Sequence, residues 1–116
     1  MQEIRGDKAH LNIADALQQL EAVTDGHSIT LFEHGSPQVK LSAPREHDLQ
    51  KPHTRDEIYV VARGSGVFFN GEARRPFRPG DLLFAPAGSV HRFEDFTDDF
   101  AVWVMFFGPE GGEPLA

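Results

Sequence analysis

The pattern of apolar and polar residues along the chain changes its period near residue 26. Before that point apolar residues recur at helical spacing: Ile13, Ala16, Leu17 and Leu20. Asn12 stands where an N-cap side chain would accept a backbone hydrogen bond, and the polar residues before it show no clear period. The sequence therefore predicts one short helix over residues 12–22, preceded by an N-terminal arm over residues 1–11.

After residue 26 the apolar positions alternate with polar ones, and turn-forming residues recur about every eight to twelve positions. This pattern is typical of an all-β sandwich or barrel and predicts one over residues 27–107. The expected strands are residues 27–33, 38–42, 57–62, 67–70, 75–77, 82–85, 90–93 and 100–107. The last strand is apolar on both faces, so one set of its side chains should line a barrel while the other packs against the helix or a second subunit.

Length and composition limit the class of protein. The 116 residues suit a single domain, with residues 108–116, rich in glycine and proline, as a loose tail. Eleven Lys and Arg against 18 Asp and Glu give a net charge of −7, which argues against nucleic acid or an anionic membrane as a partner. No cysteine is present, which excludes disulfides and thiolate chemistry. The first twenty residues lack the apolar core of a signal peptide and no window is apolar enough to span a bilayer, so a cytoplasmic location is expected.

A histidine and a glutamate lie four residues apart at the start of the strand over residues 57–62. Side chains at even separation on a strand point to the same face, so His53 and Glu57 can reach into one cavity. Tyr59 shares the face of Glu57, and further along the chain Phe93 shares the face of His91. We expect both aromatic side chains to look into the barrel near this cavity.

Two segments of the chain carry motifs that match a known pair. The motif G-x5-P-x-G-x2-H is matched by Gly80, Pro86, Gly88 and His91. The second half of G-x5-H-x-H-x3-4-E-x6-G is matched by His53, Glu57 and Gly64. With both motifs in register, the chain resembles the cupin family. The resemblance implies a double-stranded β-helix, a small jelly-roll barrel, with metal ligands inside it near one mouth.

The chain departs from the cupin motifs at three positions. Arg45 replaces the first glycine, Lys51 replaces the first histidine ligand and Asp95 replaces the final asparagine. Cupins usually assemble three histidines and one glutamate, and this chain retains three candidates, His53, Glu57 and His91. His47 shares the parity of Lys51, His53 and Glu57 along the chain, but only a bulge or a loop could bring it in as a fourth ligand.

The retained ligands suit a divalent metal ion, with Fe(II) first and Mn, Ni or Zn as alternatives, and they leave positions open for oxygen or substrate. The other interpretation is a barrel without metal, in which both histidines are hydrogen-bonded core residues and Glu57 pairs with Lys51. A charged Lys51 beside the site would weaken metal binding, whereas a neutral or outward-turned one could hold an anionic substrate beside the metal.

The resemblance and the candidate ligands together favour a metal-dependent enzyme that acts on a small organic molecule. Dioxygenase-type chemistry is preferred over isomerase, lyase or cyclase chemistry, since a redox metal with open positions can bind O2 and a chelating substrate together. Tyr59 or Lys51 would orient or protonate the substrate. The rival interpretation is a non-catalytic ligand-binding or accessory cupin whose metal is structural or absent. Cupins commonly dimerise, so the resemblance also implies a homodimer.

Overall fold

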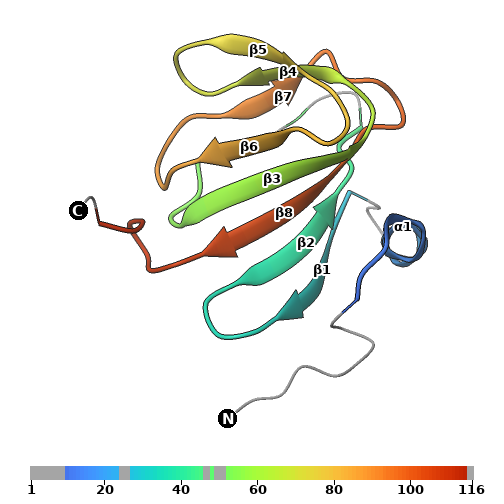
Figure 1. Ribbon diagram of the computed structural model, residues 1–116, viewed down its shortest axis with the longest axis horizontal. Coiled ribbons are helices and arrows are strands. Elements are labelled where there is room, and N and C mark those ends of the chain that lie inside the picture. Colours follow the sequence, from blue (N-terminus) through green and yellow to red (C-terminus); the bar gives the residue numbers. More distant parts are fainter. Residues whose placement is uncertain (1–9, 24–26, 46–47, 49–51, 115–116) are drawn as a thin grey trace.

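The computed structural model describes residues 10–23, 27–45, 48 and 52–114. This part of the chain contains one helix and eight strands (Figure 1). In chain order they are α1 (Ile13–Glu21), β1 (Ser28–Glu33), β2 (Gln38–Ser42), β3 (Asp56–Arg63), β4 (Gly66–Phe69), β5 (Arg74–Phe77), β6 (Leu82–Ala85), β7 (Arg92–Glu94) and β8 (Ala101–Phe107). The prediction of a mostly β protein with one short helix is confirmed, and the strand boundaries agree with the expected ones to within two residues.

The strands pair antiparallel and form two sheets. The larger sheet has five strands in the order β1-β2-β8-β3-β6, and the smaller has three in the order β5-β4-β7. Strand β8, the last along the chain, lies between β2 and β3 and joins the N-terminal hairpin to the central strand (Figure 1). Segments that are far apart in the sequence therefore become neighbours in the larger sheet.

Strand β8 contacts a different part of the protein on each face. Val102 and Val104, which are 0% and 4% exposed, join the core between the two sheets. Ala101 and Trp103 belong instead to the apolar cluster that includes α1. The prediction that one set of β8 side chains faces the interior is confirmed, and the helix is the partner of the other set at these two positions.

The helix α1 begins where the sequence places its cap. The Asn12 side chain accepts a hydrogen bond from the backbone N–H of Asp15 at 2.9 Å and donates one to its carboxylate. Ala16 and Leu20 are each 2% exposed and pack with Leu31 of β1 and Leu41 of β2, so α1 covers the outer face of this hairpin. In the described segments no helix has the length and apolar character that a membrane crossing needs.

The core between the sheets has an aromatic end, formed by Phe77, Phe93, Phe96 and Phe100. The ring centroid of Phe100 is 4.9 Å from those of Phe77 and Phe93. Tyr59 extends this group, since its ring is 5.0 Å from Phe93 on one side and 6.0 Å from the His91 ring on the other. Packed aromatic rings therefore run from the core to His91, the histidine of the second motif.

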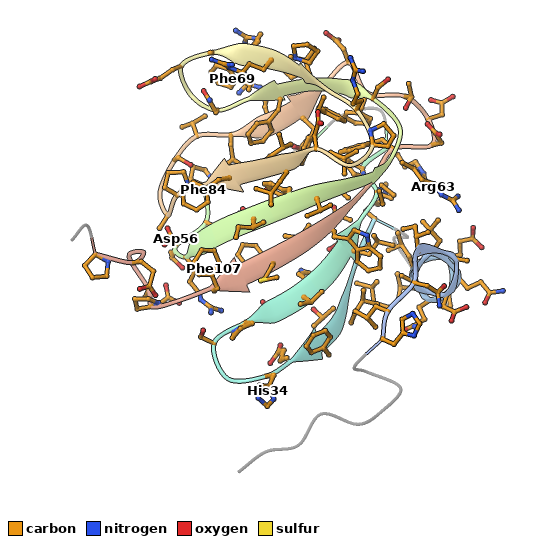
Figure 2. The ribbon with its side chains drawn as sticks, viewed as in Figure 1. His34, Asp56, Arg63, Phe69, Phe84 and Phe107 are labelled. Carbon is orange, nitrogen blue, oxygen red and sulfur yellow. The ribbon has the colours of Figure 1, made fainter. Side chains whose placement is uncertain are left out.

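Residues 108–114, expected to be part of a loose tail, are tied to the start of β3. The N–H of Gly111 donates to the carbonyl of Thr54 at 2.7 Å, and that of Glu113 donates to the Asp56 carboxylate at 2.8 Å. The other oxygen of Asp56 accepts from the N–H of Ala87 at 2.9 Å. The N–H of Glu113 and then that of Ala87 stabilise the charged carboxylate, so the pKa of Asp56 lies below its usual value. Figure 2 shows Asp56 at one end of β3 and Arg63 at the other.

Candidate metal centre

The three candidate ligands come from two segments that the fold brings together. His53 lies just before β3, Glu57 is the second residue of β3, and His91 lies just before β7. The N–H of Gly88 donates to the carbonyl of His53 at 2.7 Å, which ties the turn before His91 to the segment before β3. Glu57 also pairs with Ala85 of β6, the strand that leads into this turn. The two motif segments therefore meet at one place.

The ligand atoms of the three side chains lie within 4.8 Å of one another. Oε1 of Glu57 is 3.1 Å from Nε2 of His91 and 3.9 Å from Nε2 of His53. The side chains of Glu57 and His91 are each 2% exposed, whereas that of His53 is 36% exposed. Atoms that each lie about 2.1 Å from one metal ion are about 3 to 4 Å from one another. The observed spacing therefore fits a divalent ion held by one carboxylate oxygen and two imidazole nitrogens.

Two of these ligand atoms are buried and have no hydrogen-bond partner within the described residues: Oε1 of Glu57 and Nε2 of His91. Nδ1 of His91 lies 3.0 Å from the carbonyl oxygen of Ser89, which can only accept, so Nδ1 carries a proton. These two atoms lie 3.1 Å apart and form an ion pair only when His91 is protonated. Neither atom has a hydrogen-bond partner among the described residues, which fits two ligands of one ion.

Neighbouring groups also determine how readily His91 accepts a proton. Burial is the largest single influence and lowers the pKa of His91, whereas the nearby Glu57 carboxylate and the Ser89 carbonyl raise it. The Asp48 carboxylate acts in the same direction, so the pKa of His91 lies above its ordinary value. Protons and a metal ion therefore compete for Nε2, and metal binding to protonated His91 releases a proton.

A cavity of about 150 Å³ lies beside the three ligands. Besides His53 and Glu57, its walls are formed by Ser28, Lys40, Ser42, Tyr59, Val104 and Phe106. Tyr59 is 1% exposed and looks into this cavity, as its parity with Glu57 along the strand predicts. The site therefore combines three metal-binding side chains with a small, largely apolar chamber.

The polar side chains that β2 contributes to this cavity were not predicted from the sequence. Lys40 and Ser42 are two residues apart on a strand and share one face, with Leu41 buried on the other. Lys40 pairs with Val104 of β8, which in turn pairs with Tyr59 of β3. The alternation was visible in the sequence, but the cavity that Lys40 faces depends on the pairing of β2 with β8.

Two further candidates lie outside the described residues. Lys51 was predicted to take the place of a ligand, to pair with Glu57 or to contact the substrate. His47 was considered as a fourth ligand. Both roles stay predictions.

Comparison with known proteins identifies similar sequences. The model of the cupin domain family (Cupin_2) matches residues 39–107. An uncharacterized protein of Streptomyces coelicolor is 32% identical over 98 residues, which cover 83% of this chain and 93% of that protein. Acireductone dioxygenase 1 of Pectobacterium atrosepticum is 35% identical over 104 residues. This match covers 84% of the present chain but only 58% of the dioxygenase, so the chain spans little more than half of that protein's length.

Solved structures share the arrangement of strands. A cupin-2 domain containing protein from Shewanella frigidimarina superposes with a TM-score of 0.65 over 88% of this chain and 97% of its own, at 16% identity. KdgF from Halomonas sp. superposes with a TM-score of 0.62 over 72% of this chain and 80% of its own, at 19% identity. At these identities the likeness shows the fold alone.

Proposed function

Since the chain belongs to the cupin domain family, we propose that it is a metal-dependent enzyme acting on a small organic molecule, with dioxygenase-type chemistry as the first candidate reaction. The observation that carries this proposal is the unpartnered pair of buried atoms, Oε1 of Glu57 and Nε2 of His91, beside a cavity. The 35% identity to a protein named acireductone dioxygenase supports the reaction class. Isomerase, lyase and cyclase chemistry rank after it.

In this proposal His53, Glu57 and His91 hold the ion, with Fe(II) first and Mn, Ni or Zn as alternatives. Two imidazoles and one carboxylate form a donor set that each of these ions accepts. When bound, the ion supplies Lewis acidity and, in the case of Fe(II), redox chemistry. Nδ1 of His91 donates to Ser89, which fixes the tautomer that presents Nε2 to the ion.

The remaining side chains of the cavity bind and orient the substrate. Tyr59 lines the cavity, and its hydroxyl is the candidate group for donating a hydrogen bond or a proton to a substrate atom. Val104 and Phe106 supply apolar walls that keep water from the reacting atoms. Lys51 is the second candidate for the donor role because of its place two residues before His53.

The proposal includes a closed jelly-roll barrel and a homodimer. Family membership supports the barrel, and so does a core whose side chains come from both sheets. Apolar side chains exposed on the outer face of β3 and β6 support a dimer: Val60, Leu82 and Phe84, the last labelled in Figure 2. Light scattering at micromolar protein concentration should give the mass of two chains, and a monomer mass would refute the dimer.

A non-catalytic ligand-binding or accessory cupin is the second candidate function. The size of the cavity beside the ligands, taken alone, favours the accessory role, because about 150 Å³ is a small space for a substrate or any other bound molecule. Small-molecule sites commonly measure about 300 to 1,000 Å³. In this case the three ligands hold a structural ion or none.

Metal analysis combined with oxygen uptake tests the proposed function. Protein expressed in metal-supplemented medium, or reconstituted with Fe(II) without air, should contain one ion per chain. It should then take up O2 when an acireductone or another chelating carbonyl compound is added. Protein that holds no stoichiometric metal after reconstitution would rule the proposal out.

Replacing His91 by alanine separates an enzyme from a barrel with a structural ion. An enzyme should lose turnover while its fold stays intact, whereas a structural ion should take thermal stability with it. The matched control is His10→Ala, because His10 is exposed and lies outside the site. This control should keep both metal content and turnover.

A further inference from the structure

A second cavity adjoins the one that holds the candidate ligands. It measures about 260 Å³ and is lined by Gln38, Lys40, His53, Thr54, Arg55 and Phe106. Three of these residues, Lys40, His53 and Phe106, also line the first cavity. A molecule with one end in each cavity would therefore pass the Lys40 side chain, which lines both of them.

The register of the strands fixes the face to which Lys40 points. Lys40 of β2 pairs with Val104 of β8, and Val104 pairs with Tyr59 of β3. Directly paired residues point to the same face of a sheet, and both Val104 and Tyr59 belong to the core between the sheets. Lys40 therefore lies on the inner face, opposite the outer face that α1 covers.

Two cationic side chains of the second cavity lack a carboxylate partner among the described residues. The Lys40 ammonium makes no hydrogen bond or ion pair there. Arg55 donates from Nε to the carbonyl of Gly108 at 2.9 Å and from a terminal nitrogen to the carbonyl of Ser36, so neutral groups hold it in place. In a chain with a net charge of −7, two uncompensated cations at one cavity are an unusual arrangement.

A carboxylate of the protein does not fill this role within the described part of the chain. Glu57 is the one acidic residue that lines either cavity, and its Oε1 is directed to the histidines, 3.1 Å from His91. Partly buried cations are stabilised by an anion that they can contact, because burial removes part of their hydration. Lys40 and Arg55 are therefore placed to bind an anionic group of a ligand.

We propose that the site takes a small organic acid, whose carboxylate binds Lys40 and Arg55 in the second cavity. The other end of the acid enters the first cavity beside His53 and Glu57, a placement that rests on the proposed function. Lysine and arginine bind carboxylates through charge-assisted hydrogen bonds, which a neutral group of the same shape forms only weakly. The two small cavities limit the ligand to a short acid.

Malonate and its neutral counterpart malonamide test the inference without any metal. The two molecules have the same skeleton, and only malonate offers a carboxylate. Calorimetric titration of metal-free wild-type protein should show malonate binding about tenfold or more tightly than malonamide. Equal affinities, or no binding of malonate at millimolar concentration, would overturn the inference.

The variant Lys40→Met keeps the length of the side chain and removes its charge. It should weaken malonate binding by about tenfold or more, while Lys40→Arg should restore most of the affinity. The matched control is Arg63→Met, because Arg63 lies at the end of β3 far from Asp56 and the site (Figure 2). Malonate binding by Lys40→Met at wild-type affinity would contradict the proposal.

The same proteins distinguish failure of this inference from failure of the proposed function. Lys40→Met should bind metal as the wild type does, since Lys40 is not one of the three ligands. Wild-type protein that binds metal but not malonate would refute the organic-acid site alone. Protein that binds malonate but no metal would refute the proposed function and leave the carboxylate site in place.

Discussion

The two ends of the core between the sheets are built in opposite ways. At the aromatic end, the rings of Phe77, Phe93 and Phe100 lie 4.9 to 5.6 Å apart and are at most 3% exposed. At the site end, Glu57 and His91 are equally buried, but each has a polar atom without a partner among the described residues. Packing at the first end supplies stability, and the second end keeps groups that cost free energy until a ligand binds.

Removing a ring from the aromatic end should have the largest effect on stability. Phe100 is 0% exposed and contacts three other phenylalanines. Phe100→Ala should lower the free energy of unfolding by about 3 to 5 kcal/mol, measured by urea denaturation. The control Phe84→Ala removes a ring that is 51% exposed and should cost about 1 kcal/mol or less. Equal losses of stability in the two variants would show that packing at the aromatic end does not supply the stability assigned to it.

Replacing a ligand at the site end should lower metal affinity without lowering the stability of the metal-free protein. Glu57→Gln should weaken binding of a divalent ion by about 100-fold or more, because the charged ligand is lost. The metal-free variant should be as stable as the wild type or more stable, since the free-energy cost of burying the carboxylate charge has been removed. Competition with a chelator measures the affinity and urea denaturation the stability. Glu72→Gln, at an exposed position, is the control and should change neither.

A smaller effect on stability is expected from replacing Asp56. Its carboxylate accepts hydrogen bonds from the N–H groups of Glu113 and Ala87 and so ties both segments to the start of β3, beside the site. Its lowered folded-state pKa means that this stabilisation is fully present above the unfolded value of 3.8. It is lost as the pH falls through the folded pKa. Asp56→Asn should therefore lower Tm at neutral pH, and the difference from wild type should shrink below about pH 4. A Tm difference that did not change with pH would contradict this account.

The smallest effect on stability is expected at the N-cap of α1, which belongs to neither end of the core. Asn12→Ala removes the hydrogen bond to the N–H of Asp15 and should cost about 1 kcal/mol. The helix covers the outer face of the β1-β2 hairpin, so metal affinity should stay at the wild-type value. A change in metal affinity would show that the outer face influences the site.

Local signals in the sequence were sufficient for much of the fold. The Asn12 cap predicts the start of α1, and the double apolar face of β8 predicts a strand buried on both sides. His53, Glu57 and His91 were found because their spacing follows a motif, and the structure brings their ligand atoms within 4.8 Å. Short-range patterns of this kind predict structure correctly because each depends on the residues of one helix, strand or turn.

Features that depend on pairing between distant segments could not be predicted. Lys40 became a site residue only because β2 lies next to β8, and nothing near Lys40 in the sequence signals that neighbour. The anchoring of Gly111 and Glu113 to the start of β3 was missed for the same reason, since their glycine- and proline-rich surroundings are typical of a loose segment. Register and long-range hydrogen bonds are properties of the folded chain.

One metal ion is expected to bind between the two histidines and the glutamate. Diffraction from crystals soaked with Fe(II) or Mn(II), recorded at the absorption edge of the metal, tests it most directly. We expect one anomalous peak per chain, in contact with Nε2 of His53, Oε1 of Glu57 and Nε2 of His91. A peak elsewhere, or no peak between these three atoms at saturating metal, would contradict it.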